Sequence, residues 1–212
     1  MGTNDIALLP ATHRRRRRRL AGLLLVVATA ATIGAASISL AIFTSAQTVG
    51  ANAFTTGTIV LGVAPASAIF TSSSMMPGDA VPTGVPGQAV TITNSGTGAL
   101  RYAISGASTD ADGKHLNTQL LITVRQPDGN AGSSCTLMTG NSLFSAVVPT
   151  AGVNMAGDPA QGAQAGDRTL AAGSSETLCF KASLPLATTN AYQAATSTYT
   201  FTFNAEQTAN NP

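Results

Sequence analysis

Few residues of this sequence have side chains that could do chemistry, and they do not form a catalytic pattern. Asp110 and Asp112 precede His115 in the stretch STDADGKH, which contains part of a calcium-loop spacing. The glutamate that closes an EF-hand is missing, so a surface turn is the favoured interpretation. A single histidine in a polar loop is usually solvated. Without HExxH, GxSxG or phosphate-loop motifs, we predict no catalytic, cofactor-binding or metal site.

The most concentrated charge is a run of six arginines, Arg14 to Arg19. Without the first 41 residues, five basic residues face eight acidic ones, a net charge of 5 − 8 = −3. The rest of the chain is therefore mildly acidic, and we expect no nucleic-acid partner. An arginine run beside an apolar stretch is typical of the cytoplasmic flank of a membrane-inserted segment.

An uncharged apolar stretch, Leu20 to Phe43, follows the arginines. This order is typical of an export signal, so we predict a secreted, cell-surface-associated protein that contacts the membrane only through this segment. Ser39 and Ala41 are the small residues that a signal peptidase requires, which predicts cleavage between Ala41 and Ile42. The predicted signal peptide is residues 1–41, with an arginine-rich n-region at 14–19 and an apolar h-region at 20–41. A second cleavage site after Ala36 and a retained transmembrane anchor remain alternatives.

Two cysteines, Cys135 and Cys179, lie in the exported part. An even number of cysteines in an oxidising compartment predicts one disulfide. Closing that loop would stabilise the fold by about 4 kcal/mol in the chain-entropy model. Two buried thiols are the alternative, and a metal site is disfavoured because other ligands are scarce.

Beyond the leader, short stretches of alternating apolar and polar residues are separated by turn residues, and no helical period is evident. Candidate strands are residues 53–63, 67–71, 90–93, 100–105, 119–125, 177–184 and 198–203. The turn-rich run Asn94 to Gly98 joins two of them and predicts a β-hairpin. Gly129 to Gly173, rich in small and polar residues, is expected to be a long loop with one apolar island at Leu143 to Val148. The disulfide would hold this loop down.

Seven or eight strands of this kind imply two packed sheets. We therefore predict an all-β fold: a jelly-roll-like antiparallel β-sandwich over residues 54–205, preceded by an N-terminal signal or transmembrane helix. The polar residues 206–212 are expected to form a disordered tail.

Four motifs in order carry a family resemblance: NAFTTGTIVL (52–61), MMPGD (75–79), VTITNSGTGALRY (90–102) and AYQAATSTYTFTFNAEQ (191–207). Together they resemble the TasA/camelysin family of exported proteins. The resemblance covers both ends of the mature domain, whereas residues 105–190 match nothing specific. It implies a jelly-roll domain, processing by a dedicated signal peptidase, and a role as a subunit of extracellular fibres or of a biofilm matrix.

In fibre-forming members of that family, the mature N-terminal segment completes a sheet of the next subunit. The corresponding donor strand here is residues 42–53, in which Phe43, Gln47, Val49 and Ala51 would share one face. Twelve residues at ~3.3 Å each reach ~40 Å, comparable to the width of such a domain. The expected partner is therefore a further copy of the chain, in a homopolymer.

Three alternatives remain open. The segment 42–53 could instead be a flexible leader or pair with its own domain. A camelysin-like cell-surface metallopeptidase would need three zinc ligands, for which the sequence offers no local cluster. A monomeric surface adhesion or binding module would need exposed aromatic residues, yet the chain has no tryptophan, and most of its tyrosines, Tyr102, Tyr192 and Tyr199, lie within strand patterns.

Overall fold

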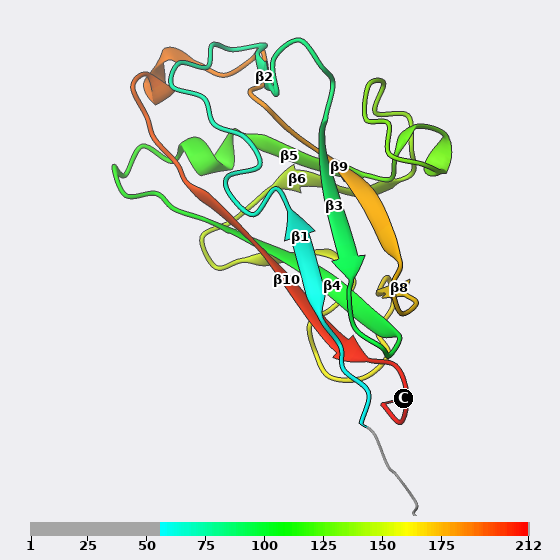
Figure 1. The fold of residues 1–212 in the computed structure, drawn as a ribbon. Helices are drawn as coiled ribbons and strands as arrows, with labels where there is room; N and C mark the ends of the chain where they lie inside the picture. The colour runs from blue at the N-terminus through cyan, green and yellow to red at the C-terminus, as the bar shows by residue number, and fades with distance from the viewer. Residues whose placement is uncertain (1–55, 212) are drawn as a thin grey trace, which may run out of the picture. The chain divides into compact units, whose positions relative to one another are not determined.

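The computed structural model describes residues 56–211, which consist mainly of β-strands and loops (Figure 1). Two antiparallel sheets bury their apolar faces against each other in a sandwich-like arrangement, so the predicted all-β class is confirmed. The predicted signal peptide (1–41) and donor strand (42–53) lie outside the described residues. No helix between residues 56 and 211 is long and apolar enough to cross a membrane.

The larger sheet has six strands. Its spatial order is β1 (Leu61–Ala64), β3 (Gln88–Asn94), β9 (Ser175–Ser183), β5 (Leu121–Arg125) and β6 (Ser142–Val147), and β2 (Ala80–Val81) pairs with the end of β9. The four-stranded sheet has the order β10 (Tyr199–Gln207), β4 (Leu100–Ser108) and β7 (Val153–Ala156), and β8 (Arg168–Leu170) also pairs with β4. The 3₁₀ turns are η1 (Leu116–Thr118), η2 (Asp128–Asn130) and η3 (Asn190–Tyr192).

Period-two alternation explains why the central strands form the core. On β9, the side chains of Leu178, Phe180 and Ala182 are fully buried, and Cys179 on the other face is buried as well. The first three belong to the same core cluster as Leu100 and Ile104 of β4, which are also fully buried. Complete burial of each large apolar side chain contributes about 2 kcal/mol, so these two strands provide much of the driving force for stacking the sheets.

The predicted hairpin between β3 and β4 is wrong. β3 pairs with β1 and β9 in the six-stranded sheet, whereas β4 pairs with β10, β7 and β8 in the other sheet. The connection at 95–99 is therefore an arch from one sheet to the other. Alternation predicts which face of a strand is buried but not which strand lies beside it, so the same pattern fits a hairpin and an arch.

A buried asparagine holds the arch in place. The Nδ2 of Asn94 lies 2.8 Å from the carbonyl oxygen of Gly98, 3.2 Å from that of Leu170 and 3.1 Å from that of Ala171. Its Oδ1 accepts a 3.0 Å hydrogen bond from the backbone N–H of Gly96. One fully buried side chain thus joins the β3–β4 arch to the β8–β9 turn and satisfies backbone groups of both.

Both ends of the described chain meet this arch. The carbonyl of Thr58 accepts hydrogen bonds from the backbone N–H groups of Thr97 (2.9 Å) and Gly98 (3.0 Å), and the N–H of Thr208 donates to the carbonyl of Ala99 (3.2 Å). A Cβ at position 96 would lie 2.3 Å from the Thr58 oxygen, so this close approach requires Gly96. The chain therefore enters the domain beside the end of β10.

The predicted long loop at 129–173 is also corrected, because it contains three strands. The apolar island forms most of β6, which pairs with β5, and the short strands β7 and β8 pair with β4. Strands of only three or four residues are too short to show a period in the sequence. The observed total among the described residues is ten strands rather than seven or eight.

Two further predictions differ from the structure. Residues 67–71 form no strand; Ile69 and Phe70 instead pack against the core from the loop between β1 and β2. The tail predicted from residue 206 begins too early, because β10 continues through Gln207. Glu206 pairs with Arg101 at 2.5 Å, and the same arginine donates to the backbone oxygen of Asn211. The residues joined by these contacts lie far apart in the sequence, so no local pattern predicts the contacts.

Replacing Asn94 with alanine should lower the free energy of unfolding by about 2–4 kcal/mol, because it leaves buried backbone groups at the arch without partners. Asn204→Ala is the matched control, since Asn204 is exposed on β10 and should change stability by less than about 0.5 kcal/mol. Urea unfolding followed by circular dichroism measures both. Equal stabilities for the two variants would contradict the role assigned to Asn94.

Candidate functional site

The acidic loop before His115 is tied together by its own side chains. The carboxylate of Asp110 lies 2.5 Å from Nδ1 of His115. The carboxylate of Asp112 accepts backbone hydrogen bonds from Lys114 at 3.1 Å and Thr196 at 2.6 Å, and these bonds lower its pKa. Protein donors thus occupy the oxygens that a calcium ion would need. Residues 56–211 contain no cluster of three or more potential metal ligands.

The predicted disulfide between Cys135 and Cys179 is confirmed, with a Cα–Cα distance of 5.4 Å. Cys179 is in the middle of β9, and Cys135 belongs to the loop between β5 and β6. The bond therefore holds this loop against the six-stranded sheet.

Asp128 organises the same loop. Its carboxylate accepts hydrogen bonds from Oγ of Ser134 (2.8 Å) and from the backbone N–H groups of Leu137 (3.0 Å) and Thr139 (3.1 Å). Partial desolvation opposes ionisation, but the hydrogen bonds outweigh it and hold the pKa of Asp128 well below its usual range. Asp128 and the disulfide give the loop a fixed shape.

A polar network joins the two sheets near the arch. The hydroxyl of Tyr102, on β4, donates a 2.6 Å hydrogen bond to Glu176 of β9, and Arg168 of β8 pairs with the same carboxylate. Burial and the bond to Glu176 raise the pKa of Tyr102. Because each charged group is engaged by another member, the network is suited to fixing the sheets together.

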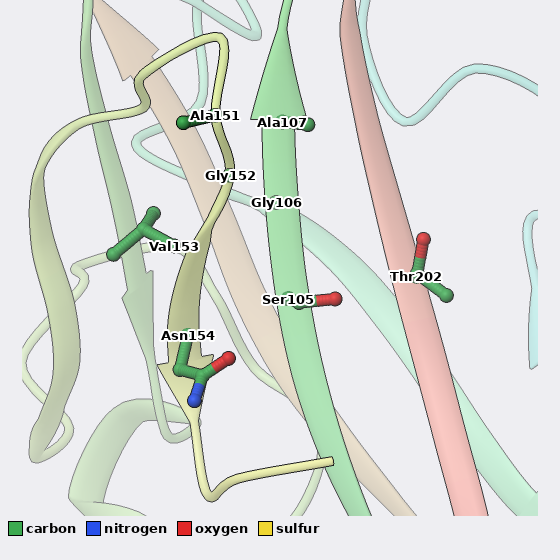
Figure 2. A pocket seen from close by; sticks show the side chains of 8 residues that line it. All are labelled: Ser105, Gly106, Ala107, Ala151, Gly152, Val153, Asn154 and Thr202. Carbon is green, nitrogen blue, oxygen red and sulfur yellow. The ribbon is translucent and has the colours of Figure 1, made fainter.

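The outer face of the four-stranded sheet has a shallow hollow of about 460 Å³ (Figure 2). Its polar side chains come from three neighbouring strands: Asn154 on β7, Ser105 on β4 and Thr202 on β10. The remaining lining residues are glycines, alanines and Val153. No titratable side chain lines the hollow, so it offers no acid or base for catalysis.

An incompletely covered part of the core lies between β1 and β10. β1 is one end of the six-stranded sheet, and β10 is one end of the four-stranded sheet. The opposite ends are β6 and β7, and these two strands contact each other. β1 and β10 are therefore edge strands on the same side of the domain. Leu61 and Val63 of β1 and Phe201 and Phe203 of β10 pack against the core but are only partly buried. We call these four residues the β1–β10 seam. Within residues 56–211, β10 pairs with β4 alone, so its outer edge has no strand beside it.

Aromatic contacts position the seam. The ring of Phe201 lies edge-on to that of Phe180, with centroids 5.4 Å apart, and to that of Phe70, at 6.1 Å. Phe203 lies 6.4 Å from Phe180. Phe180 is fully buried at the centre of β9, so Phe201 and Phe203 contact the buried core while remaining only partly buried themselves.

The predicted cleavage residues Ala41 and Ile42 and the predicted donor residues Phe43, Gln47, Val49 and Ala51 lie outside the described residues. Sequence reasoning missed Asn94, Asp128 and Glu176 as organising residues. An Asn-Ser-Gly run signalled the first as a turn, but nothing in the sequence shows which distant backbone groups it binds. No protein-family model matches the chain, and no curated protein sequence matches it.

Replacing both cysteines with serine should lower the free energy of unfolding by about 4 kcal/mol, because the denatured chain gains the entropy that the loop closure removes. The expected difference should vanish when both proteins are unfolded in reductant. Equal stability of the oxidised wild type and the double variant would contradict this.

Asp128→Asn should flatten the acid dependence of stability. A carboxylate whose folded pKa is depressed contributes stability that is present above the ordinary aspartate pKa of about 3.9 and is lost as the pH falls toward the lower folded value. The wild type should therefore lose more stability than the variant as the pH is lowered below about 4. Other carboxylates titrate in both proteins, so the difference between their unfolding curves isolates Asp128.

Proposed function

We propose that the chain is a secreted structural subunit of extracellular fibres or of a biofilm matrix, with a jelly-roll-like domain. Copies assemble by donor-strand addition, in which residues 42–53 of one copy pair with the outer edge of β10 in the next. The observation that carries the proposal is the seam, where a nine-residue edge strand presents partly buried phenylalanines. The resemblance to the TasA/camelysin family supports the same role.

The chemistry of the edge suits a strand of this composition. An added strand would hydrogen-bond to the unpaired backbone groups of β10 and place alternate side chains over the seam. Phe43 and Val49 are the larger apolar residues on the shared face of the donor strand. Its twelve residues span ~40 Å at ~3.3 Å each, and nine residues of β10 need about 30 Å, so the donor covers the full edge.

The point of entry favours another copy as the acceptor. Thr58 is fixed beside the arch, at the end of the domain where β10 finishes. To lie along its own β10, the donor would have to reverse direction between residue 53 and Thr58, whereas addition to a neighbour needs no reversal. A head-to-tail contact that does not close on itself extends into a filament.

We propose no catalytic role. The carboxylates of Asp112, Asp128 and Glu176 are each engaged by donors of the same domain. These carboxylates therefore have structural roles, because they stabilise loops or join the two sheets. The proposed assembly depends on backbone pairing instead.

Deleting residues 42–53 from the secreted chain should give a soluble protein that forms no filaments, because the acceptor edge remains but the donor is gone. The core residues and the disulfide lie within residues 56–211, so the domain is expected to stay folded. Electron microscopy and analytical ultracentrifugation measure the loss. Normal filaments from the deletion variant would contradict the donor-strand proposal.

A peptide of residues 42–53 should bind the deletion variant with one peptide per domain, and hydrogen exchange should slow along β10. The matched control is the same peptide with Phe43→Asp and Val49→Asp, which should bind at least tenfold more weakly because charged residues would replace both apolar anchors. Protection on β6 rather than β10 would show that the acceptor edge is assigned wrongly.

A further inference from the structure

The six-stranded sheet ends on its other side in β6, a second edge strand whose apolar residues are only partly covered. Among residues 56–211, β6 pairs only with β5. Its core-facing residues Phe144 and Ala146 lie opposite Val124 and Ile122 of β5. Both β5 residues are fully buried, whereas Phe144 is partly exposed and Ala146 is exposed. On this side the six-stranded sheet therefore ends in a strand with no paired neighbour, and Phe144 and Ala146 remain accessible there.

β6 also lacks most of the devices that keep edge strands apart. Such edges usually carry charged residues, prolines or bulges. No charged residue occurs between Asp128 and Asp158, and the first proline after the strand is Pro149. One register irregularity is present, at the Val124/Arg125 step opposite the start of β6, and it leaves Phe144 to Val147 in regular pairing.

We propose that β6 is a lateral assembly site, which pairs antiparallel with β6 of a second copy about a two-fold axis perpendicular to the sheet. This proposal goes beyond donor-strand addition and does not depend on it. The two six-stranded sheets become one continuous sheet. The interface is isologous, so it joins two domains, or two filaments, side by side.

The register centred on Ser145 makes the edge self-complementary. Ser145 then lies opposite Ser145 of the second copy, and Phe144 lies opposite Ala146 of the second copy in both directions. A large ring beside a small side chain fills the space on the core-facing side without a clash. Leu143 meets Val147 at each end of the pair. With no charge along the strand, two identical edges meet no electrostatic repulsion.

A second copy fits β6 better than the donor strand does. β6 has four regularly paired residues and one core-facing ring, whereas β10 has nine residues and two phenylalanines on the seam. The twelve-residue donor gains more hydrogen bonds and more apolar contact at β10. The shorter, uncharged edge of β6 therefore suits pairing with an identical strand from a second copy.

The test places charge at the centre of the pair. Ser145→Lys and Ser145→Glu each put like charges directly opposite one another, at Cβ distances of roughly 5 Å. In the protein that lacks residues 42–53, each variant should weaken dimerisation at least tenfold by analytical ultracentrifugation. An equimolar mixture of the two should restore a heterodimer, which also shows that both variants are folded. Ser175→Lys and Ser175→Glu are the matched controls, because Ser175 is exposed on the central strand β9.

In the secreted chain with its leader, Ser145→Lys should leave single filaments intact and abolish their lateral pairing in electron micrographs. Three results would overturn the proposal: a wild-type domain that stays monomeric at millimolar concentration, dimerisation that charge at position 145 does not change, or loss of the filaments themselves. The last would make β6 the acceptor for the leader. Failure of the leader deletion to prevent filaments would bear on the proposed function alone.

Discussion

The arch between β3 and β4 is the constraint on which the rest of the structure depends. A hairpin at this point would place both strands in one sheet, with their apolar residues side by side. The arch places them in opposite sheets, so that Ile92 and Leu100 both face the enclosed core. Asn94 enforces this path because its amide satisfies backbone groups of the arch and of the β8–β9 turn. The entry of the chain at Thr58 is positioned by the same arch.

Stacking the sheets in this way covers the middle of the core but not its sides. β9 and β4 have neighbours on both edges, and their large apolar residues are fully buried. β10 and β6 have a neighbour on one edge only, and Phe201, Phe203 and Phe144 are correspondingly accessible. The proposed assemblies follow from this single property, because each places a strand where the isolated domain has none. In these proposals the donor strand pairs with the longer edge, β10, and a second copy pairs with the shorter edge, β6.

The sequence was sufficient for the fold class, for the strongest strands and for the disulfide. β9 and β10 were predictable because their alternation is long enough to separate a buried face from an exposed one. β7 and β8 were not, since three or four residues show no period. The choice between hairpin and arch depended on Asn94, whose partners Leu170 and Ala171 lie far along the chain. The seam was equally hidden, because the sequence shows that Phe201 faces inward but not that its strand lies at an edge.

The scarcity of charge also acquires a structural meaning. Several acidic residues make contacts within the domain. Glu176 joins the two sheets, Glu206 pairs with Arg101 beside the chain end, and Asp128 accepts hydrogen bonds that shape the disulfide-bonded loop. The exposed strand positions carry mainly threonine, serine, asparagine and alanine. Strand faces with few charged residues would let identical domains approach closely in the proposed assemblies, and the edges would then determine where the domains meet. Charged side chains thus join parts of one domain, whereas in the proposed assemblies backbone pairing joins the copies.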